Sequence, residues 1–324
     1  MTSSPKPSAS VPKWCDRTAR LFGAEGVARL AAAHVMVIGL GGVGSYTVEG
    51  LARTGVGRLT LVDCDAVCIT NINRQCHALA STIGRSKAEL MAERVLAINP
   101  SAHVEAVKDF YEARTAPSFL ARRPDVIVDA IDNITAKLHL LATCIYRAMP
   151  VVTALGASAK VDPTRVRVAD LRKTHDDPLA KTIRKNLWRV YAINLKRVSR
   201  LHAIYSDEEV ILPDPAYRSS LCGLECACPN QANQHHTCAR RRLLYGSAVF
   251  VTSVFGMIAA GLVTRFLAGD SRVDLRPTFK VLDGDEPLRD PDERWRDGTL
   301  VDPIDTEPLD ESASALPDKS DSSA

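Results

Sequence analysis

Short apolar runs alternate with amphipathic segments through the first half of the chain. An apolar run of about four to eight residues between turn-forming residues is typical of a buried strand, whereas apolar positions three and four apart are typical of a helix. These patterns predict strands at 34–38, 59–63, 103–107, 125–131 and 151–155, with helices at 42–54, 85–98, 115–122 and 134–148. Strands that alternate with helices predict an α/β fold, with a Rossmann-like, doubly wound sheet whose first half is parallel.

The pattern changes after residue 156. Segments 166–170 and 201–205 have the character of strands but lack the spacing of a parallel crossover, so we expect both to extend the sheet as antiparallel strands. A helix is expected between them at 177–190, and a lead-in helix at 14–33. The length of 324 residues is enough for one large α/β domain or two small ones.

A long apolar run covers residues 246–267, interrupted by Thr252, Ser253, Thr264 and Arg265. Its length is marginal for a membrane span, which needs about 20 apolar residues. We expect no membrane span and instead a helix buried at a subunit interface, because so long an apolar run could not stay exposed on a monomer. The run therefore predicts a homodimer.

A glycine-rich turn follows the first predicted strand. Gly39, Gly41 and Gly44 satisfy the spacing G-x-G-x-x-G, and Gly42 lies among them. Glycine lets a strand turn sharply into a helix whose N-terminus approaches a phosphate, because no Cβ obstructs either the turn or the anion. The four glycines are candidate nucleotide-binding residues.

Charged residues downstream of the turn distinguish two classes of nucleotide. Asp63 and Asp65 follow the second strand, where a ribose-binding carboxylate is expected, and a nicotinamide-dependent dehydrogenase would share them. Arg74 and Lys87 add two cations, which suit a nucleoside triphosphate because charge develops as pyrophosphate leaves. Asp132 follows the fourth strand, where a carboxylate can hold Mg²⁺ over the phosphates. The set predicts ATP and Mg²⁺, with Arg74, Lys87 and Asp132 as catalytic residues.

Charge is distributed unevenly along the 324 residues, although the net charge is only +3. The segment 281–324 has 14 Asp or Glu against 4 Lys or Arg, so we expect an acidic, disordered tail, and a disordered leader at 1–13. The segment 165–200 holds 11 Lys or Arg against 3 Asp or Glu. Such a basic segment gains affinity by neutralising phosphates, so it predicts a polyanionic partner.

Nine cysteines without a signal peptide indicate a reducing compartment; we expect the cytoplasm, with the mitochondrion as the alternative. Four of the cysteines lie in the segment 219–240: Cys222, Cys226, Cys228 and Cys238. Their spacing is not the paired C-x₂-C of structural zinc sites. We therefore expect a Cys-rich crossover loop with free thiols, and structural Zn²⁺ at these cysteines is the disfavoured alternative.

Several of these blocks together resemble the ubiquitin-activating-enzyme-like superfamily. The blocks are 39–45, 63–65, 70–75, 129–133 and Lys87. Within that superfamily the chain is similar to the tRNA threonylcarbamoyladenosine dehydratases, on the blocks 18–23, 67–79, 87–89, 98–100 and 162–180. The resemblance covers about residues 14–270.

The resemblance implies an ATP-binding adenylation domain at 14–280. Such an enzyme activates the carboxylate of N6-threonylcarbamoyladenosine at tRNA position 37 and closes it into a ring, with AMP and pyrophosphate as products. The resemblance also places Asn73 and Gln75 in the nucleotide site, and it implies that Arg20 crosses a dimer interface to the partner's nucleotide. The alternative that stays open is an adenylyltransferase that activates a ubiquitin-like or sulfur-carrier protein, with a sulfur-relay protein as a further partner.

Overall fold

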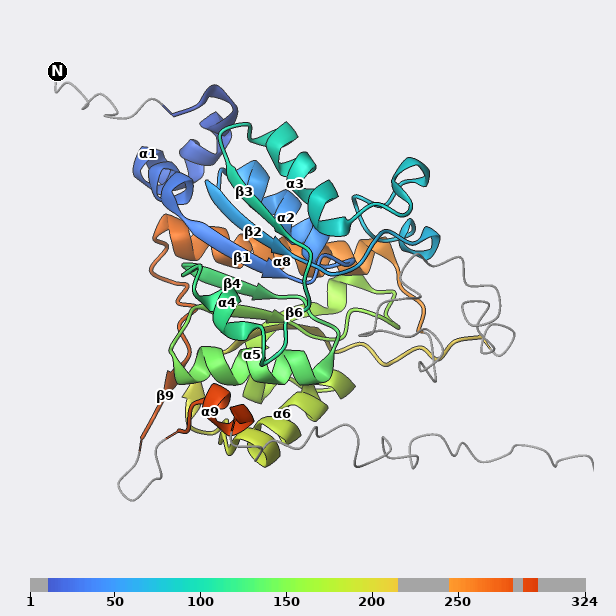
Figure 1. The fold of residues 1–324 in the computed structure, drawn as a ribbon, viewed down its shortest axis with the longest axis vertical. Helices are drawn as coiled ribbons and strands as arrows, with labels where there is room; N and C mark the ends of the chain where they lie inside the picture. The colour runs from blue at the N-terminus through green and yellow to red at the C-terminus, as the bar shows by residue number, and fades with distance from the viewer. Residues whose placement is uncertain (1–10, 215–244, 282–287, 297–324) are drawn as a thin grey trace, which may run out of the picture.

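The computed structural model describes residues 11–214, 245–281 and 288–296 (Figure 1). Its strands are β1 (His34–Ile38), β2 (Arg58–Val62), β3 (His103–Val107), β4 (Val126–Asp129), β5 (Val151–Ala154), β6 (Val166–Asp170), β7 (Val198–Ser199), β8 (His202–Ser206) and β9 (Thr278–Phe279). Its α-helices are α1 (Asp16–Ala32), α2 (Gly44–Thr54), α3 (Lys87–Ile98), α4 (Ala116–Leu120), α5 (Ile134–Tyr146), α6 (Pro178–Tyr191), α8 (Val249–Ala268) and α9 (Pro291–Arg296). The strands and helices predicted up to residue 155 are all present, with small shifts at their ends.

Seven strands form one sheet in the order β3-β2-β1-β4-β5-β8-β6. The strands from β3 to β8 in that order run parallel, and β6 at the edge runs antiparallel against β8. The predicted α/β class is confirmed, but the expectation that the strand at 201–205 is antiparallel is wrong. It pairs in parallel with β5, with Val152 opposite His202. The reason is that α6 supplies the crossover from β5 to β8, while β6 is added outside them.

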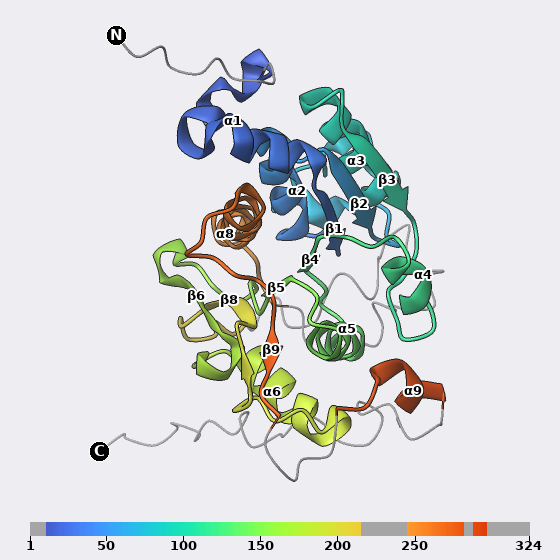
Figure 2. The same ribbon diagram turned by 90° about the vertical axis from the view of Figure 1, so that its left-hand side faces the viewer.

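Helices cover both faces of the sheet (Figure 2). Val35 and Val37 of β1 pack with α1, α2, α3 and α8, whereas Met36 and Ile38 pack with α4, α5 and α6. A strand covered on both faces is apolar at every position, which explains the continuous apolar run of β1. The strand order reverses direction between β1 and β4, and open α/β sheets bind ligands at the carboxyl ends of the strands at such a point.

The segments at the two ends of the domain differ from the expectations. The lead-in helix is present as α1, but Gly23 interrupts it with a φ of 72°. Helix α9 lies inside the segment expected to be disordered, so that expectation is wrong for residues 291–296; Arg147 Nη2 donates to the buried Asp292 carboxylate at 2.6 Å. The Cys-rich segment 219–240 and residues 1–10 and 297–324 lie outside the described residues.

Helix α8 packs against α2 over one face of the sheet. By length and composition its 20 residues could cross a membrane, but one side of α8 is buried in the core. A Cβ on Gly256 would lie 2.4 Å from the Val43 carbonyl oxygen and 2.8 Å from Tyr46 Cβ, and one on Gly50 would lie 2.6 Å from Ala260 Cβ. The two helices therefore cross with their backbones almost in contact, and glycine is needed at the crossing.

We predict that Gly256→Ala lowers the free energy of unfolding by about 1–3 kcal/mol, because the added methyl group must displace the backbone at Val43. The matched control is Gly261→Ala on the same helix, where a Cβ would meet nothing within 4 Å. That substitution should raise the free energy of unfolding by up to about 1 kcal/mol through helix propensity. Urea unfolding followed by circular dichroism measures both, and equal changes would contradict the close crossing.

Candidate functional site

The glycine-rich turn lies at the carboxyl end of β1, beside the end of β4. Gly39 has a φ of 89°, and a Cβ there would lie 2.5 Å from the Ala130 carbonyl oxygen. A Cβ on Gly44 would lie 1.8 Å from the Gly39 carbonyl oxygen. Both positions require glycine for the turn itself, because any side chain would collide with the backbone. The turn therefore starts α2 directly above the sheet edge.

The middle of the turn is open and offers polar groups to a ligand. A Cβ on Gly41 would have Gln75 Nε2 as its nearest neighbour, at 3.8 Å. Among the described residues, no acceptor bonds the backbone N–H groups of Gly41 and Gly42, and Gln75 Oε1 is buried without a partner. Free N–H groups at a helix N-terminus bind phosphate, and a buried amide oxygen without a partner is costly. These groups fit a nucleotide, with Gln75 as an acceptor.

Two carboxylates after β2 hold the turn and a lysine together. Asp63 accepts the Leu40 N–H at 2.7 Å and the Asp65 N–H at 2.8 Å. Lys87, the buried first residue of α3, donates to Asp65 Oδ2 at 2.8 Å and lies 3.9 Å from Asp63 Oδ1. Burial lowers the pKa of the Lys87 ammonium, but the carboxylates outweigh burial and raise it. Lys87 is therefore a fixed positive charge beside the turn.

This arrangement refines the predicted role of Asp63. Both of its oxygens already accept backbone N–H groups, whereas Asp65 keeps 25% of its side chain exposed. Asp65 is therefore the more accessible candidate for a ribose hydroxyl. Ligand atoms of Asp63, Cys64 and Asp65 lie within 4.8 Å of one another, but the Lys87 ammonium already pairs with Asp65 and lies beside Asp63. A metal ion bound there would have to displace the Lys87 ammonium or overcome its repulsion.

The predicted cation Arg74 lies in the loop that returns towards the turn. Its Nη1 donates to the Thr70 carbonyl oxygen at 2.8 Å and to Asn73 Oδ1 at 2.9 Å. Asn73 Nδ2 in turn donates to the Ser247 carbonyl oxygen at 2.9 Å, just before α8. These bonds orient the exposed guanidinium and fix its loop against α8. Asn73 is thus a residue that positions Arg74.

The two carboxylates around the end of β4 have different environments. Asp129 is fully buried and accepts Lys137 Nζ at 2.7 Å and Thr153 Oγ1 at 2.6 Å. Its other oxygen accepts the Ile131 N–H at 3.1 Å, which fixes the backbone that leads to Asp132. Asp132 is exposed, and its charge is among those that raise the pKa of Lys87 against the effect of burial. Asp132 therefore lies within electrostatic reach of the lysine and is the accessible carboxylate of the pair.

Lys137 is a residue that the sequence analysis missed. It is fully buried and also donates to the Ala154 carbonyl oxygen at 2.9 Å, so it joins the ends of β4 and β5. The available signal was a single lysine inside the otherwise apolar segment that forms α5. A charge in such a helix requires a buried partner of opposite sign.

Arg20 does not reach the turn of its own chain. It lies on α1, exposed, with its Nε 2.9 Å from Asp16 Oδ2. Helix α1 packs near the C-terminal ends of α2 and α8, where Gly26 approaches Ala268, whereas the turn lies at their N-terminal ends (Figure 1). The predicted role of Arg20 therefore remains a prediction about a partner subunit's site.

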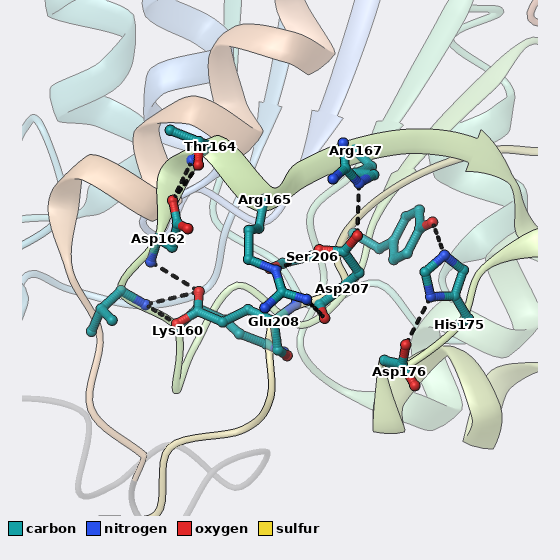
Figure 3. Close-up of polar contacts among 12 residues, drawn as sticks. Lys160, Asp162, Thr164, Arg165, Arg167, His175, Asp176, Ser206, Asp207 and Glu208 are labelled. Atoms are coloured by element: carbon teal, nitrogen blue, oxygen red, sulfur yellow. Dashed lines mark hydrogen bonds and ion pairs between the residues drawn. The ribbon is translucent and has the colours of Figure 1, made fainter.

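A second polar cluster lies at the carboxyl end of β8, on the same edge of the sheet (Figure 3). Asp207 accepts Arg165 Nε at 2.8 Å and Arg167 Nε at 2.7 Å, and these two arginines, Arg167 first, lower its pKa to about 2. Lys160 is buried and donates to the Glu208 carbonyl oxygen. Arg165 and Arg167 of the basic segment, and Lys160 just before it, are thus already engaged within the fold.

The basic segment 165–200 is consequently not one continuous face. Arg200 pairs with Asp274, and Arg184 Nη1 donates to the Thr174 carbonyl oxygen at 2.9 Å. The outer side of helix α6 presents three exposed cations: Lys181, Lys185 and Arg189. The helix begins beside the sheet edge, because Asp177 Oδ2 accepts the Gly156 N–H at 3.3 Å. The outer side of α6 therefore carries exposed cations on a helix that begins at the same sheet edge as the turn.

Comparisons with known proteins agree with this geometry. The chain is 40% identical over 246 residues to a tRNA threonylcarbamoyladenosine dehydratase of Haemophilus influenzae, covering 75% of this chain and 89% of the relative. It is 39% identical over 252 residues to the protein of that name in Bacillus subtilis, covering 78% and 93%. The crystal structure of Escherichia coli tRNA N6-threonylcarbamoyladenosine dehydratase in complex with ATP superposes with a TM-score of 0.68 at 32% identity, covering 82% of this chain and 99% of that one.

The sequence model of the ThiF family matches residues 15–291, which includes the glycine-rich turn, Lys87, Asp132 and α6. The match covers well over half of the 324 residues. The protein is therefore a member of the ThiF family.

Proposed function

We propose that the protein is an ATP-dependent tRNA threonylcarbamoyladenosine dehydratase, which closes N6-threonylcarbamoyladenosine into its cyclic form. The observation that carries this proposal is the open glycine turn with the protonated Lys87 fixed beside it. That arrangement suits a triphosphate, and the relatives that match most of the chain bear the name of this enzyme. The enzyme class follows from site and relatives together.

The reaction has two steps, in which both reacting groups belong to the substrate. A carboxylate oxygen of the modified adenosine attacks the α-phosphorus of ATP, and the bond to pyrophosphate breaks. The carbamoyl group of the same side chain then bonds to the activated carbon, AMP leaves with the electrons of the C–O bond, and a proton is lost. The nucleoside loses one water overall. Positioning can supply much of the rate, so a protein nucleophile is not required.

The residues of the turn have separate roles in this scheme. The N–H groups around Gly41 would hold phosphate oxygens, and the cations Arg74 and Lys87 would stabilise the charge that develops as pyrophosphate leaves. Mg²⁺ supplies further neutralisation of the phosphates when bound, and the exposed Asp132 is the carboxylate that we propose to hold it. Asp65 would hold the ribose.

The alternative is activation of a ubiquitin-like or sulfur-carrier protein, which shares the first step. Helix α6 favours tRNA, since its 14 residues hold four Lys or Arg and no Asp or Glu. The cysteines that could accept a carrier lie outside the described residues.

Exchange of radiolabelled pyrophosphate into ATP distinguishes the two functions. We expect exchange to depend on tRNA that carries N6-threonylcarbamoyladenosine and to be absent with tRNA that lacks this modification. A carrier protein with a free C-terminal carboxylate serves as the competing substrate. Exchange that responds to the carrier protein and not to the modified tRNA would overturn the proposed substrate.

We predict that Arg74→Ala slows this exchange by about 100- to 1,000-fold, because a charge-assisted contact to the phosphates is lost. The control is Arg114→Ala, an exposed arginine that pairs with Glu112 and has no role in the proposed scheme, which should exchange normally. Lys87→Ala should also lose exchange, but it leaves Asp63 and Asp65 without their cation and should unfold more easily. Arg74 is thus the cleaner test, and normal exchange in Arg74→Ala would refute its role.

The outer side of α6 is proposed to contact tRNA phosphates. Replacing Lys181, Lys185 and Arg189 by glutamine should weaken tRNA binding and change the slope of log K against log salt by roughly 2–3, since each contact contributes about −0.7 to −0.9. The control is the double substitution of Arg265 and Arg272, which both pair with Asp270 after α8. An unchanged slope in the α6 variant, measured by titration at several salt concentrations, would contradict the contact.

We also propose a homodimer, because α8 leaves Phe250 and Met257 exposed at 51% and 44% on an apolar helix. Arg20, which lies away from its own turn, would then be free to approach the partner's nucleotide. Light scattering should give twice the chain mass of 35.2 kDa, and Met257→Glu should shift the protein towards the monomer. A monomer at micromolar concentration for the unaltered protein would sink this proposal.

A further inference from the structure

Helix α6 carries an exposed tryptophan in the middle of its basic side. Trp188 is 61% exposed. It shares one side of the helix with Lys181, Lys185 and Arg189, because positions i, i+4, i+7 and i+8 lie on one face. The opposite side is buried in the core through Ala180, Ile183, Leu187 and Tyr191. Trp188 is therefore mostly exposed and is not one of the buried residues that pack α6 against the core.

The neighbours of Trp188 on this side indicate what kind of partner it contacts. An indole is a flat surface on which any nucleic-acid base can stack, and cations on either side of it can contact the phosphates that flank that base. A lipid surface would require more than one apolar group on the same side of α6, and the other exposed residues named there are cationic. Charge and shape together match an unpaired base in a polyanionic strand.

The position of α6 relates this side chain to the glycine turn. The helix begins where Asp177 bonds to Gly156 at the sheet edge, and Trp188 lies ten residues further, about 15 Å along the helix axis. The strand ends of β1 and β4 share that edge with β5. A tRNA loop that places its modified adenosine at the turn can therefore lay a neighbouring part of the same loop along α6.

We propose that Trp188 stacks on an unpaired base of the tRNA loop that presents the modified adenosine, while Lys181, Lys185 and Arg189 contact the flanking phosphates. This inference rests on the proposed tRNA substrate and adds a base contact to the phosphate contacts. In this proposal, α6 contacts the part of the tRNA loop that lies beside the reacting nucleotide.

Substitutions at Trp188 separate stacking from charge. Trp188→Leu should weaken tRNA binding by about 5- to 150-fold, the factor that corresponds to 1–3 kcal/mol for one stacked base. Trp188→Phe keeps an aromatic face and should retain most of the affinity. The salt slope should stay unchanged in both variants, since no charge is removed. The matched control is Trp14→Leu, which alters an exposed tryptophan near Gly55 at the far end of α2 and should bind tRNA normally.

Fluorescence provides a second and direct readout. In a protein that keeps Trp188 while the other two tryptophans are phenylalanine, added tRNA should quench the emission, and a base-free polyanion such as heparin should not.

Wild-type affinity in Trp188→Leu, or equal quenching by heparin, would overturn the stacking contact. Loss of the dimer in Trp188→Leu, seen by light scattering, would overturn it too, because the indole would then belong to a subunit contact. If the unaltered protein converts tRNA while stacking fails, only this inference fails; if it neither binds nor converts tRNA, the proposed function fails.

Discussion

The site depends on one hydrogen bond, which the Leu40 backbone N–H donates to the Asp63 carboxylate. It joins the end of β2 to the glycine turn after β1, and the same carboxylate borders the buried Lys87. Burying one charge costs several kcal/mol unless an opposite charge lies beside it. The lysine and the two carboxylates therefore stabilise one another, and removing Lys87 would leave Asp63 and Asp65 without their cation.

The sheet brings the remaining parts of the site to that contact. Parallel strands end at one edge, so the Gly39 turn, the Asp129–Lys137 pair and the Asp207 cluster all lie along it. Glycines at the crossing of α2 and α8 let α8 pack closely against α2, the helix that follows the turn. Helix α6 leads away from the same edge with its basic side exposed. The nucleotide end and the proposed tRNA surface are thus parts of one rigid arrangement.

The sequence could predict features that depend on local pattern. Alternating strands and helices and the glycine turn follow from short-range spacing, whereas the roles of Arg74 and Lys87 stay predictions. Features that depend on long-range contact could not be predicted in this way. The direction of β8 depends on where α6 packs, and the burial of Lys87 depends on two carboxylates 22 or more residues away. The pairing of Arg165 and Arg167 with Asp207 likewise joins residues about 40 positions apart, so the basic segment looked more uniform in sequence than it is.

We propose that this site activates a carboxylate on tRNA and removes one water from the modified nucleoside. Mass analysis of tRNA nucleosides, after incubation of the purified protein with ATP and tRNA that carries N6-threonylcarbamoyladenosine, tests this most directly. We predict that the modified nucleoside loses the mass of one water, only when ATP is present, with AMP formed in equal amount. An unchanged nucleoside after ATP has been converted to AMP would contradict it.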